Sequence, residues 1–343
     1  MIKEHRMKQR NIGIDILKSW MAFEVVLCHF GVGISNPLYT YFFSHFQGLA
    51  VPLFMLSSFY LSGKLFFDEE YFSNKFLFKR VWRIYYPVLS WAIVYLLFYV
   101  VLHLGGIAQI KDGNVSQYMG AFLWQITTGH SLNSPMWFNI VLFYLTFLYY
   151  FMKFFFGVAF FDYLIVLSAF CAYVVQVLGL YNCFSLLGYE LSYPLGRFIE
   201  MVPYASIGLL IYRSILKPNR LIYLLILLST MILLKLMFMD NNTHYYGYGG
   251  LVRLLEAVVL FFLFIKIKIK NKSKVLERII VFISKYSMGV YCIHILVGKL
   301  LGFLGVSYYL SGWWNSIVIY FVSLFSAYLI SRIPIKPLKL MVE

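Results

Sequence analysis

Four ionisable side chains occur within the first long apolar run of the chain, near residues 12–33: Asp15, Lys18, Glu24 and His29. Ionisable groups inside an apolar helix are costly, and they tend to be functional. A neutral imidazole titrates near working pH, so His29 suits a general base that removes a proton from a hydroxyl group inside a membrane cavity. The alternative for His29 is a structural histidine whose ring nitrogens are satisfied by neighbouring groups.

Helical geometry places Lys18 and His29 on one face of this run. They are eleven positions apart, which leaves about 20° between them around the helix and roughly 16 Å along its axis. Asp15 lies on nearly the same face, whereas Glu24 points about 140° away from His29. We expect Lys18 near the cytoplasmic surface and His29 near the outer surface, with snorkelling to the interface as the alternative for Lys18. Asp15 and Glu24 are weaker candidates for lining a substrate cavity, and Glu24 has pairing with another helix as its alternative.

Arg80 and Arg83 form a second candidate site, for phosphate. They are three residues apart, so they share one face of a helix that enters the membrane from the cytoplasm. Planar guanidinium groups bind phosphate oxygens through paired hydrogen bonds, and two of them together suit the phosphates of a soluble cytoplasmic donor. The alternative is that both arginines only anchor the helix at the inner membrane surface.

Two later helices begin at the outer face with oppositely charged residues three positions apart. Arg197 and Glu200 begin one of them, and Arg253 and Glu256 begin the other. This spacing favours a salt bridge within each helix, with the lining of an outer cavity as the alternative. His294 lies in the middle of a late apolar run, where a structural role and a place in the cavity are equally compatible with the sequence.

The elements that must position these residues are membrane-spanning helices. Of the 343 residues, 62% are hydrophobic and 13% are charged, and the mean hydropathy is +0.78; soluble globular proteins have roughly 25% charged residues. Backbone polar groups cannot stay unbonded in hydrocarbon, and the alternating pattern of a membrane barrel is absent, so the apolar runs are predicted to be helices. Each span needs about 20 residues, which leaves no room for a sizeable soluble domain. We therefore predict an all-α polytopic bundle in which residues 1–343 form a single transmembrane domain.

Apolar runs separated by charged breaks predict about ten transmembrane helices. The predicted spans are roughly 12–33, 48–66, 84–103, 136–152, 159–180, 197–214, 221–239, 251–267, 279–301 and 313–332. With the N-terminus in the cytoplasm, most of the 29 Lys and Arg residues fall on the inner side, and the outer loops proper hold only Lys111. Because basic loops stay in the cytoplasm, both termini are predicted to be cytoplasmic, in a multi-pass protein of the cell membrane.

Neither nucleic-acid binding nor a metal site is predicted. The net charge of +15 follows from the basic inner loops and needs no nucleic-acid partner. The four cysteines, Cys28, Cys171, Cys183 and Cys292, lie far apart and lack the spacing of metal ligands. We interpret them as small hydrophobic residues.

The motifs around the candidate residues resemble, in order and over most of the chain, those of the membrane acyltransferase-3 family. Lys18 and His29 match its first-helix pattern of arginine or lysine, ten residues, then histidine. Residues 11–18 are similar to its Asp-x-x-Arg start, with lysine in place of the commoner arginine. Residues 50–57 resemble its second helix, and residues 80–83 fit its Arg-x-x-Arg element. Residues 284–294 look like its late helix. The chain departs from the pattern at Ser58, where the family usually has glycine.

The resemblance implies an O-acyltransferase, because members of this family transfer acyl groups, often acetyl, to extracytoplasmic sugars. It implies acyl-CoA, with acetyl-CoA foremost, as a co-substrate rather than a permanently bound cofactor. Arg80 and Arg83 would hold its phosphates, Lys18 would lie near the pantetheine arm, and His29 would be the general base for a saccharide or polysaccharide hydroxyl. The alternative is an export component for polysaccharide or lipid-linked glycan that performs no acyl transfer; the arginine pair and the absence of an internal repeat argue against it.

Overall fold

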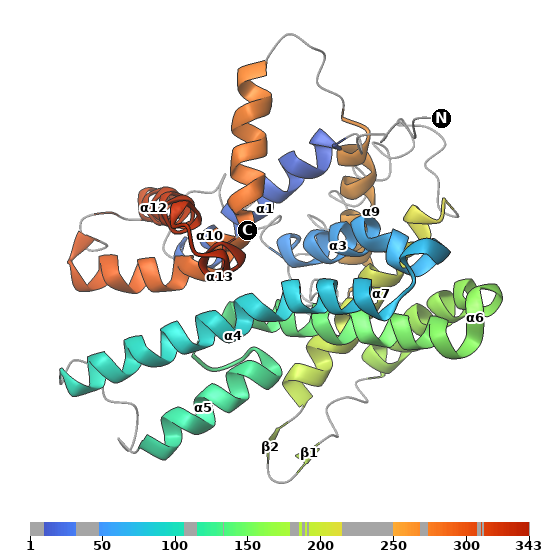
Figure 1. The fold of residues 1–343 in the computed structure, drawn as a ribbon, viewed down its shortest axis with the longest axis horizontal. Coiled ribbons are helices and arrows are strands. Elements are labelled where there is room, and N and C mark those ends of the chain that lie inside the picture. The colour runs from blue at the N-terminus through green and yellow to red at the C-terminus, as the bar shows by residue number, and fades with distance from the viewer. Residues whose placement is uncertain are drawn as a thin grey trace.

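The computed structural model describes residues 10–31, 48–105, 115–132, 134–178, 185–186, 189–190, 192–214, 250–267, 274–306, 310 and 312–342. Figure 1 shows that these residues are helical almost throughout. In chain order the elements are α1 (Ile12–Phe30), α3 (Ala50–Phe67), η2 (Glu69–Tyr71), α4 (Asn74–Leu104), α5 (Val115–Thr128), η3 (Ser134–Met136), α6 (Trp137–Val177), β1 (Ser185–Leu186), β2 (Tyr189–Glu190), α7 (Ser192–Tyr212), α9 (Leu251–Ile265), α10 (Lys274–Phe303), α12 (Trp313–Arg332) and α13 (Lys336–Leu340). The strands β1 and β2 pair antiparallel over two residues each.

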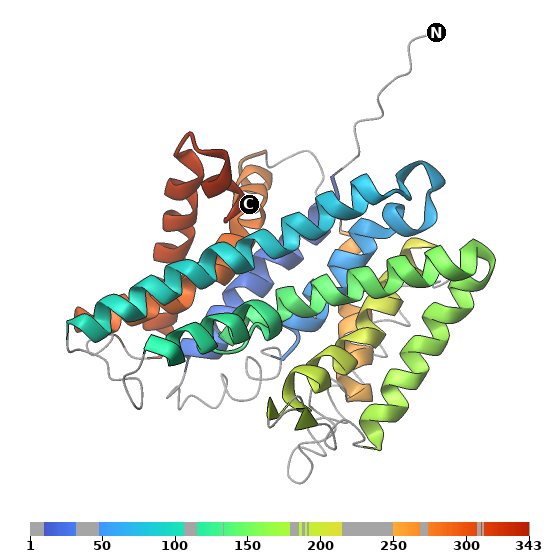
Figure 2. The same ribbon diagram turned by 60° about the horizontal axis from the view of Figure 1, so that its bottom comes forward.

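The predicted spans that fall within the described residues correspond to helical segments. Spans 136–152 and 159–180 are the two parts of α6, which is interrupted at Gly157 by a φ of 70° and a ψ of 176°. A positive φ of this kind favours glycine, and Figure 2 shows the two parts of α6 running in different directions. The predicted span 221–239 lies outside the described residues, as does Cys183. The count of ten spans therefore stays a prediction.

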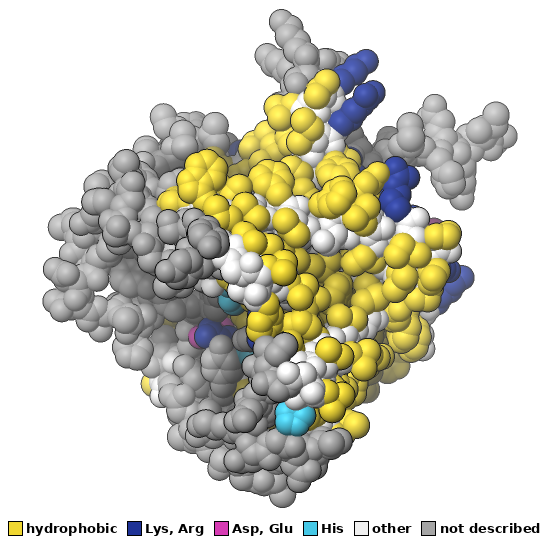
Figure 3. Space-filling view, turned by 90° about the vertical axis from the view of Figure 1, so that its left-hand side faces the viewer, with side chains coloured by type: hydrophobic (Ala, Val, Ile, Leu, Met, Phe, Trp, Pro, Cys, Tyr) yellow, Lys and Arg dark blue, Asp and Glu magenta, His cyan; other side chains and the backbone are white. Residues whose placement is uncertain are grey.

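The helices have the length and the surface of membrane-spanning elements. Six of them, α3, α4, α6, α7, α10 and α12, are long and apolar enough to cross a bilayer. Two further predicted spans within the described residues, α9 and α1, are not among these six. Helix α9 has only 15 residues, and α1 carries three charged residues, Asp15, Lys18 and Glu24. On α6, Phe155 is 71% and Phe160 is 64% exposed, and Figure 3 shows a broad apolar face with Lys and Arg side chains along one edge. Such a surface suits lipid rather than water.

Two groups of helices meet along α1 and α3. In the first, α10 packs between α1 and α12, and in the second, α7 packs between α3 and α6. The long helix α4 lies along α6 and also contacts α10 and α13, so it crosses both groups (Figures 1 and 2). A Cβ atom at Gly208 would lie 2.7 Å from the carbonyl oxygen of Leu56, so α7 and α3 approach this closely only because that residue has no side chain.

Asn11 fixes the start of α1. Its side-chain oxygen accepts hydrogen bonds from the backbone N–H groups of Gly13 at 3.0 Å and Ile14 at 3.3 Å, which the first turn of a helix otherwise leaves unpaired. Its side-chain nitrogen donates to the carbonyl oxygen of Ile265, at the end of α9, at 3.1 Å. The cap therefore sets both the first turn of α1 and its position against α9, and with it the depth of the functional candidates further along α1.

Candidate functional site

A cavity of about 340 Å³ lies where α1, α3, α4, α6 and α10 meet. We call it the bundle cavity. Its cationic residues are Lys18, Arg80, Arg83 and Lys285; its other lining residues are Phe54, Ser57, Ser58, Leu61, Ser62, Ile84, Pro87, Phe138, Leu142, Ser287, Met288 and Tyr291. Among the described residues that line it, every charged side chain is basic. Positive charge beside an apolar wall suits a ligand with an anionic part and an apolar arm.

Arg80 is held in place between α3 and α6. Its Nη2 donates a hydrogen bond to Ser58 Oγ at 3.3 Å, and its Nε donates to Thr146 Oγ1 at 3.3 Å. The guanidinium also lies over the ring of Phe59, 5.5 Å from its centroid. Ser58, the residue that departs from the family pattern, is thus a direct partner of Arg80. Arg83, almost one helical turn further on, is exposed and lines the same cavity.

Lys285 is a cavity residue that the sequence analysis did not single out. It comes from α10, far along the chain from Lys18 and the two arginines, and its Nζ donates to the hydroxyl of Tyr286 at 3.4 Å. The feature of the sequence that could have identified Lys285 is its position in the late-helix motif at residues 284–294. No spacing rule within one helix links it to α1 or α4, so its place in the same cavity as Lys18 comes only from tertiary structure.

The two candidate histidines lie against each other. The ring of His29, exposed near the end of α1, has its centroid 5.2 Å from that of His294, which is fully buried in α10. Nδ1 of His294 is 3.1 Å from the carbonyl oxygen of Val290. Because a carbonyl oxygen only accepts, Nδ1 carries the proton, and Nε2 is left as an acceptor. Among the described residues, Nε2 has no hydrogen-bond partner.

Aromatic side chains lie between the histidine pair and the bundle cavity. Tyr291 lines the cavity, and its ring centroid is 6.3 Å from that of His294. Phe54 also lines the cavity, with its ring centroid 6.5 Å from that of Tyr291. His29 itself is not a lining residue. Helix α1 therefore carries Lys18 in the cavity and His29 beyond this aromatic wall, in the order that their axial separation predicts.

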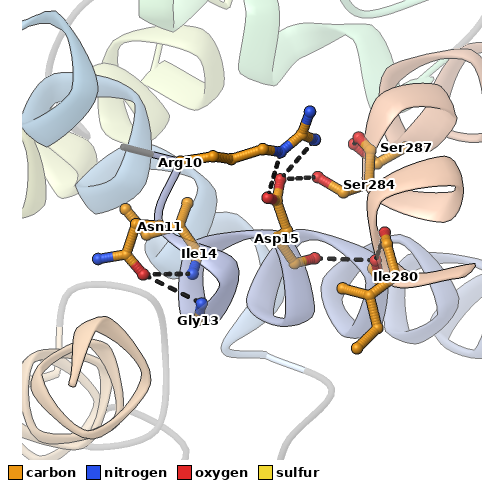
Figure 4. Close-up of polar contacts among 9 residues, drawn as sticks. Arg10, Asn11, Gly13, Ile14, Asp15, Ile280, Ser284 and Ser287 are labelled. Atoms are coloured by element: carbon orange, nitrogen blue, oxygen red, sulfur yellow. Dashed lines mark hydrogen bonds and ion pairs between the residues drawn. The ribbon is translucent and has the colours of Figure 1, made fainter. Parts of the chain in front are cut away.

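Asp15 connects α1 to α10 and does not line the bundle cavity. Its carboxylate accepts from Arg10 Nε at 2.5 Å and Nη2 at 2.9 Å, and from Ser284 Oγ at 2.6 Å (Figure 4). The hydrogen bond and charge of Asp15 raise the pKa of the Arg10 guanidinium, against the effect of burial. The Asp15 side chain is 9% exposed, against 53% for Arg10. The contacts of Asp15 thus serve helix packing rather than the cavity.

Asp15→Ala is expected to lower the free energy of unfolding by about 2–4 kcal/mol, because a buried hydroxyl and a guanidinium both lose a charged acceptor. The change is measured by thermal unfolding of the purified protein in detergent. Asp162→Ala is the matched control: Asp162 pairs with Arg213 at 3.6 Å, and both side chains are partly exposed, so its loss costs about 0–1 kcal/mol. Equal destabilisation by the two variants would contradict a packing role specific to Asp15.

Glu24 is buried away from the bundle cavity. It is 2% exposed, and its Oε1 accepts a hydrogen bond from Trp20 Nε1 at 2.8 Å. The partner is on the same helix, not on another helix as the sequence alternative proposed. Trp20 in turn stacks on Phe264 of α9, with ring centroids 5.8 Å apart. Oε2 of Glu24 has no hydrogen-bond partner among the described residues.

The within-helix salt bridges that the spacing favours are both present. Arg197 Nη1 lies 2.8 Å from Glu200 Oε2, and Arg253 Nη1 lies 3.8 Å from Glu256 Oε2. These four residues are not among those that line the bundle cavity.

Arg197 also belongs to a small cluster near the starts of α6 and α7. Its guanidinium lies 5.6 Å from the ring centroid of Trp137, against which the His130 ring stacks at 6.2 Å. Burial, together with the charge of Arg197, lowers the pKa of His130 to about 4. His130 is therefore neutral at working pH.

Fold and site together define a helical, multi-pass membrane protein with a basic cavity among its helices. The family model described as an acyltransferase domain matches residues 11–332. The chain therefore belongs to the acyltransferase-3 family, and it is a membrane acyltransferase in the general sense. Neither the curated proteins nor the solved structures contain a match to it.

Proposed function

We propose that this protein transfers an acyl group, acetyl foremost, from cytoplasmic acyl-CoA to a hydroxyl group of an extracytoplasmic saccharide or polysaccharide. One observation carries the proposal. Helix α1 has Lys18 in the basic bundle cavity, and near its C-terminal end it has His29 beside His294. A donor with an anionic end and a reactive end needs a basic binding site and a catalytic site, separated by the length of its flexible arm. Family membership supplies acyl transfer as the chemistry.

The bundle cavity suits the donor. Lys18, Arg80 and Arg83 would neutralise phosphate, and the arginines would do so through paired hydrogen bonds. The apolar lining would take the acyl-pantetheine arm. The thioester would then reach His29 by passing between Phe54 and Tyr291, which requires these rings to move. A dry path of this kind also protects the thioester from hydrolysis.

His29 would act as the general base. Its imidazole takes the proton of the acceptor hydroxyl while the hydroxyl oxygen bonds to the thioester carbonyl carbon. The tetrahedral intermediate then collapses, the carbon–sulfur bond breaks, and the departing thiolate takes the proton back from the imidazolium. The products are the sugar ester and free CoA. His294, whose Nε2 is available as an acceptor, would orient the His29 ring, and the exposure of His29 would admit an acceptor from the outer side.

The proposal is tested by ligand-dependent thermal stability of the purified wild-type protein in detergent. Acetyl-CoA is expected to raise the unfolding temperature in a concentration-dependent way, because a ligand that binds only the folded state stabilises it. Acetyl phosphate, which carries the same acyl group without the CoA moiety, is expected to have no effect. A folded protein that responds to no CoA thioester would overturn the donor assignment. The export component would then become the better explanation of the fold.

A further inference from the structure

A second cavity, of about 790 Å³, lies at one end of α10, between α12 and α13. We call it the α10–α12 groove. Its lining residues are Arg278, Val281, Phe282, Lys285, Tyr286, Tyr328, Ser331, Arg332 and Lys339. Among these described residues every charged side chain is basic, and three of the others are aromatic. The volume lies within the range of roughly 300–1,000 Å³ that small-molecule sites occupy.

The aromatic wall of the groove is held by specific contacts. Ser331 Oγ donates a hydrogen bond to the Tyr286 hydroxyl at 3.0 Å, and Arg332 Nε donates to the Tyr328 hydroxyl at 3.0 Å. The rings of Tyr286 and Tyr328 have centroids 6.0 Å apart, and the ring of Phe282 is 5.5 Å from that of Tyr328. The groove therefore has a wall of three aromatic rings held by specific contacts, and its basic side chains lie around this wall.

The segment that carries Lys339 is anchored to the rest of the bundle. Trp91 Nε1, on α4, donates a hydrogen bond to the carbonyl oxygen of Met341 at 3.0 Å. This bond fixes the residues after α13 against the helix that carries the two cavity arginines. The groove and the bundle cavity thus share α10, and the segment after α13 is anchored to α4, which lines the bundle cavity.

Lys285 connects the two cavities, because its side chain lines both of them. The bundle cavity, at about 340 Å³, is the smaller, and away from its basic residues its walls are mostly apolar. The groove, at about 790 Å³, is larger and adds three basic residues that the cavity lacks. A CoA thioester has the matching shape, with a narrow acyl-pantetheine arm, a diphosphate, and a wide nucleotide with a separate ribose phosphate.

We propose that the α10–α12 groove holds the nucleotide end of the acyl-CoA donor, an inference that rests on the proposed function. Arg278, Arg332 and Lys339 surround the ribose phosphate, and the adenine lies against the aromatic wall, since every base offers a π-face for stacking. The diphosphate lies at Lys285, which lines both cavities, and at Arg80 and Arg83 of the bundle cavity. The acyl-pantetheine arm then extends into the bundle cavity toward the histidine pair.

The test compares two donors on two double variants in lipid nanodiscs, by calorimetric titration. Acetyl-CoA carries the nucleotide, whereas S-acetyl-4′-phosphopantetheine carries only the arm and one phosphate. Arg332→Ala/Lys339→Ala is expected to weaken acetyl-CoA binding on the order of tenfold or more, because charge-assisted hydrogen bonds to the nucleotide are lost, and to leave the binding of the arm unchanged. The control Lys75→Ala/Lys79→Ala removes the same charge from exposed positions of α4 outside both cavities. It is expected to bind both donors as the wild type does.

Each contrary result has its own meaning. If Arg332→Ala/Lys339→Ala binds acetyl-CoA as tightly as the wild type, the groove is not the nucleotide site, and the proposed function stands. If that variant instead loses co-purified anionic lipid, the groove is a lipid site and the inference is wrong. If the variant binds both donors more weakly by the same factor, the inference is also wrong, because the lost contacts would not be specific to the nucleotide. A wild-type protein that binds neither donor would overturn the proposed function itself.

Discussion

His29→Ala is expected to reduce acyl transfer by about 10²–10⁴-fold, the contribution of a positioned general base. Acyl-CoA binding is expected to stay at the wild-type level, since His29 is not a lining residue of the bundle cavity. Transfer is measured in isolated membranes as acetyl label moving from acetyl-CoA into the saccharide fraction, and donor binding is measured separately on purified protein. A loss of transfer with unchanged donor binding distinguishes a general base from a structural histidine.

His103→Ala is the matched control for this experiment. His103 lies at the end of α4, with its ring 5.6 Å from that of Tyr118, and it takes no part in the proposed chemistry. It is expected to transfer acetyl at close to the wild-type rate. Full activity in His29→Ala would remove His29 from the mechanism. Loss of donor binding in that variant would instead place His29 in the donor site or in the fold.

The helices themselves were predictable because hydropathy is a local property. The predicted span 313–332 has the bounds of α12, and the charged and glycine-containing break before residue 159 marks the interruption of α6 at Gly157. The start of α4 was not predicted, because basic residues break the apolar run before residue 84. Lysine and arginine are nonetheless good helix formers, so the helix begins at Asn74, and it includes Arg80 and Arg83 as their spacing predicted.

The candidate site was predictable only where its geometry lies within one helix. The relation between Lys18 and His29, and that between Arg80 and Arg83, follows from helical periodicity. Contacts between helices do not follow from it. The sequence analysis therefore named His294 without placing it beside His29.

Side-chain direction within one helix is likewise not settled by position alone. The rotation of Glu24 away from His29 suggested a partner on another helix. Its partner in the structure is Trp20, one turn earlier on α1. Trp20 also stacks on Phe264 of α9, a contact between helices that periodicity does not encode.

The arginine pair carries the second large prediction. Arg80→Ala/Arg83→Ala is expected to weaken acetyl-CoA binding by about 10²-fold or more, because each lost charge-assisted hydrogen bond is worth about 1.5–3 kcal/mol and each 1.4 kcal/mol is a factor of ten. The dissociation constant is measured by calorimetric titration in nanodiscs. Lys75→Ala/Lys79→Ala, with the same loss of charge on the same helix, is expected to retain the wild-type affinity.

The single variants separate binding from folding. Arg80 is bonded to Ser58 and Thr146, so Arg80→Ala is expected to lower the unfolding temperature as well as the affinity. Arg83 is exposed, so Arg83→Ala is expected to lower the affinity alone. Because both guanidinium groups face one ligand, their effects should not add independently. If both arginines only anchor α4 at the membrane surface, Arg83→Ala will bind acetyl-CoA as the wild type does, and the phosphate site must lie elsewhere.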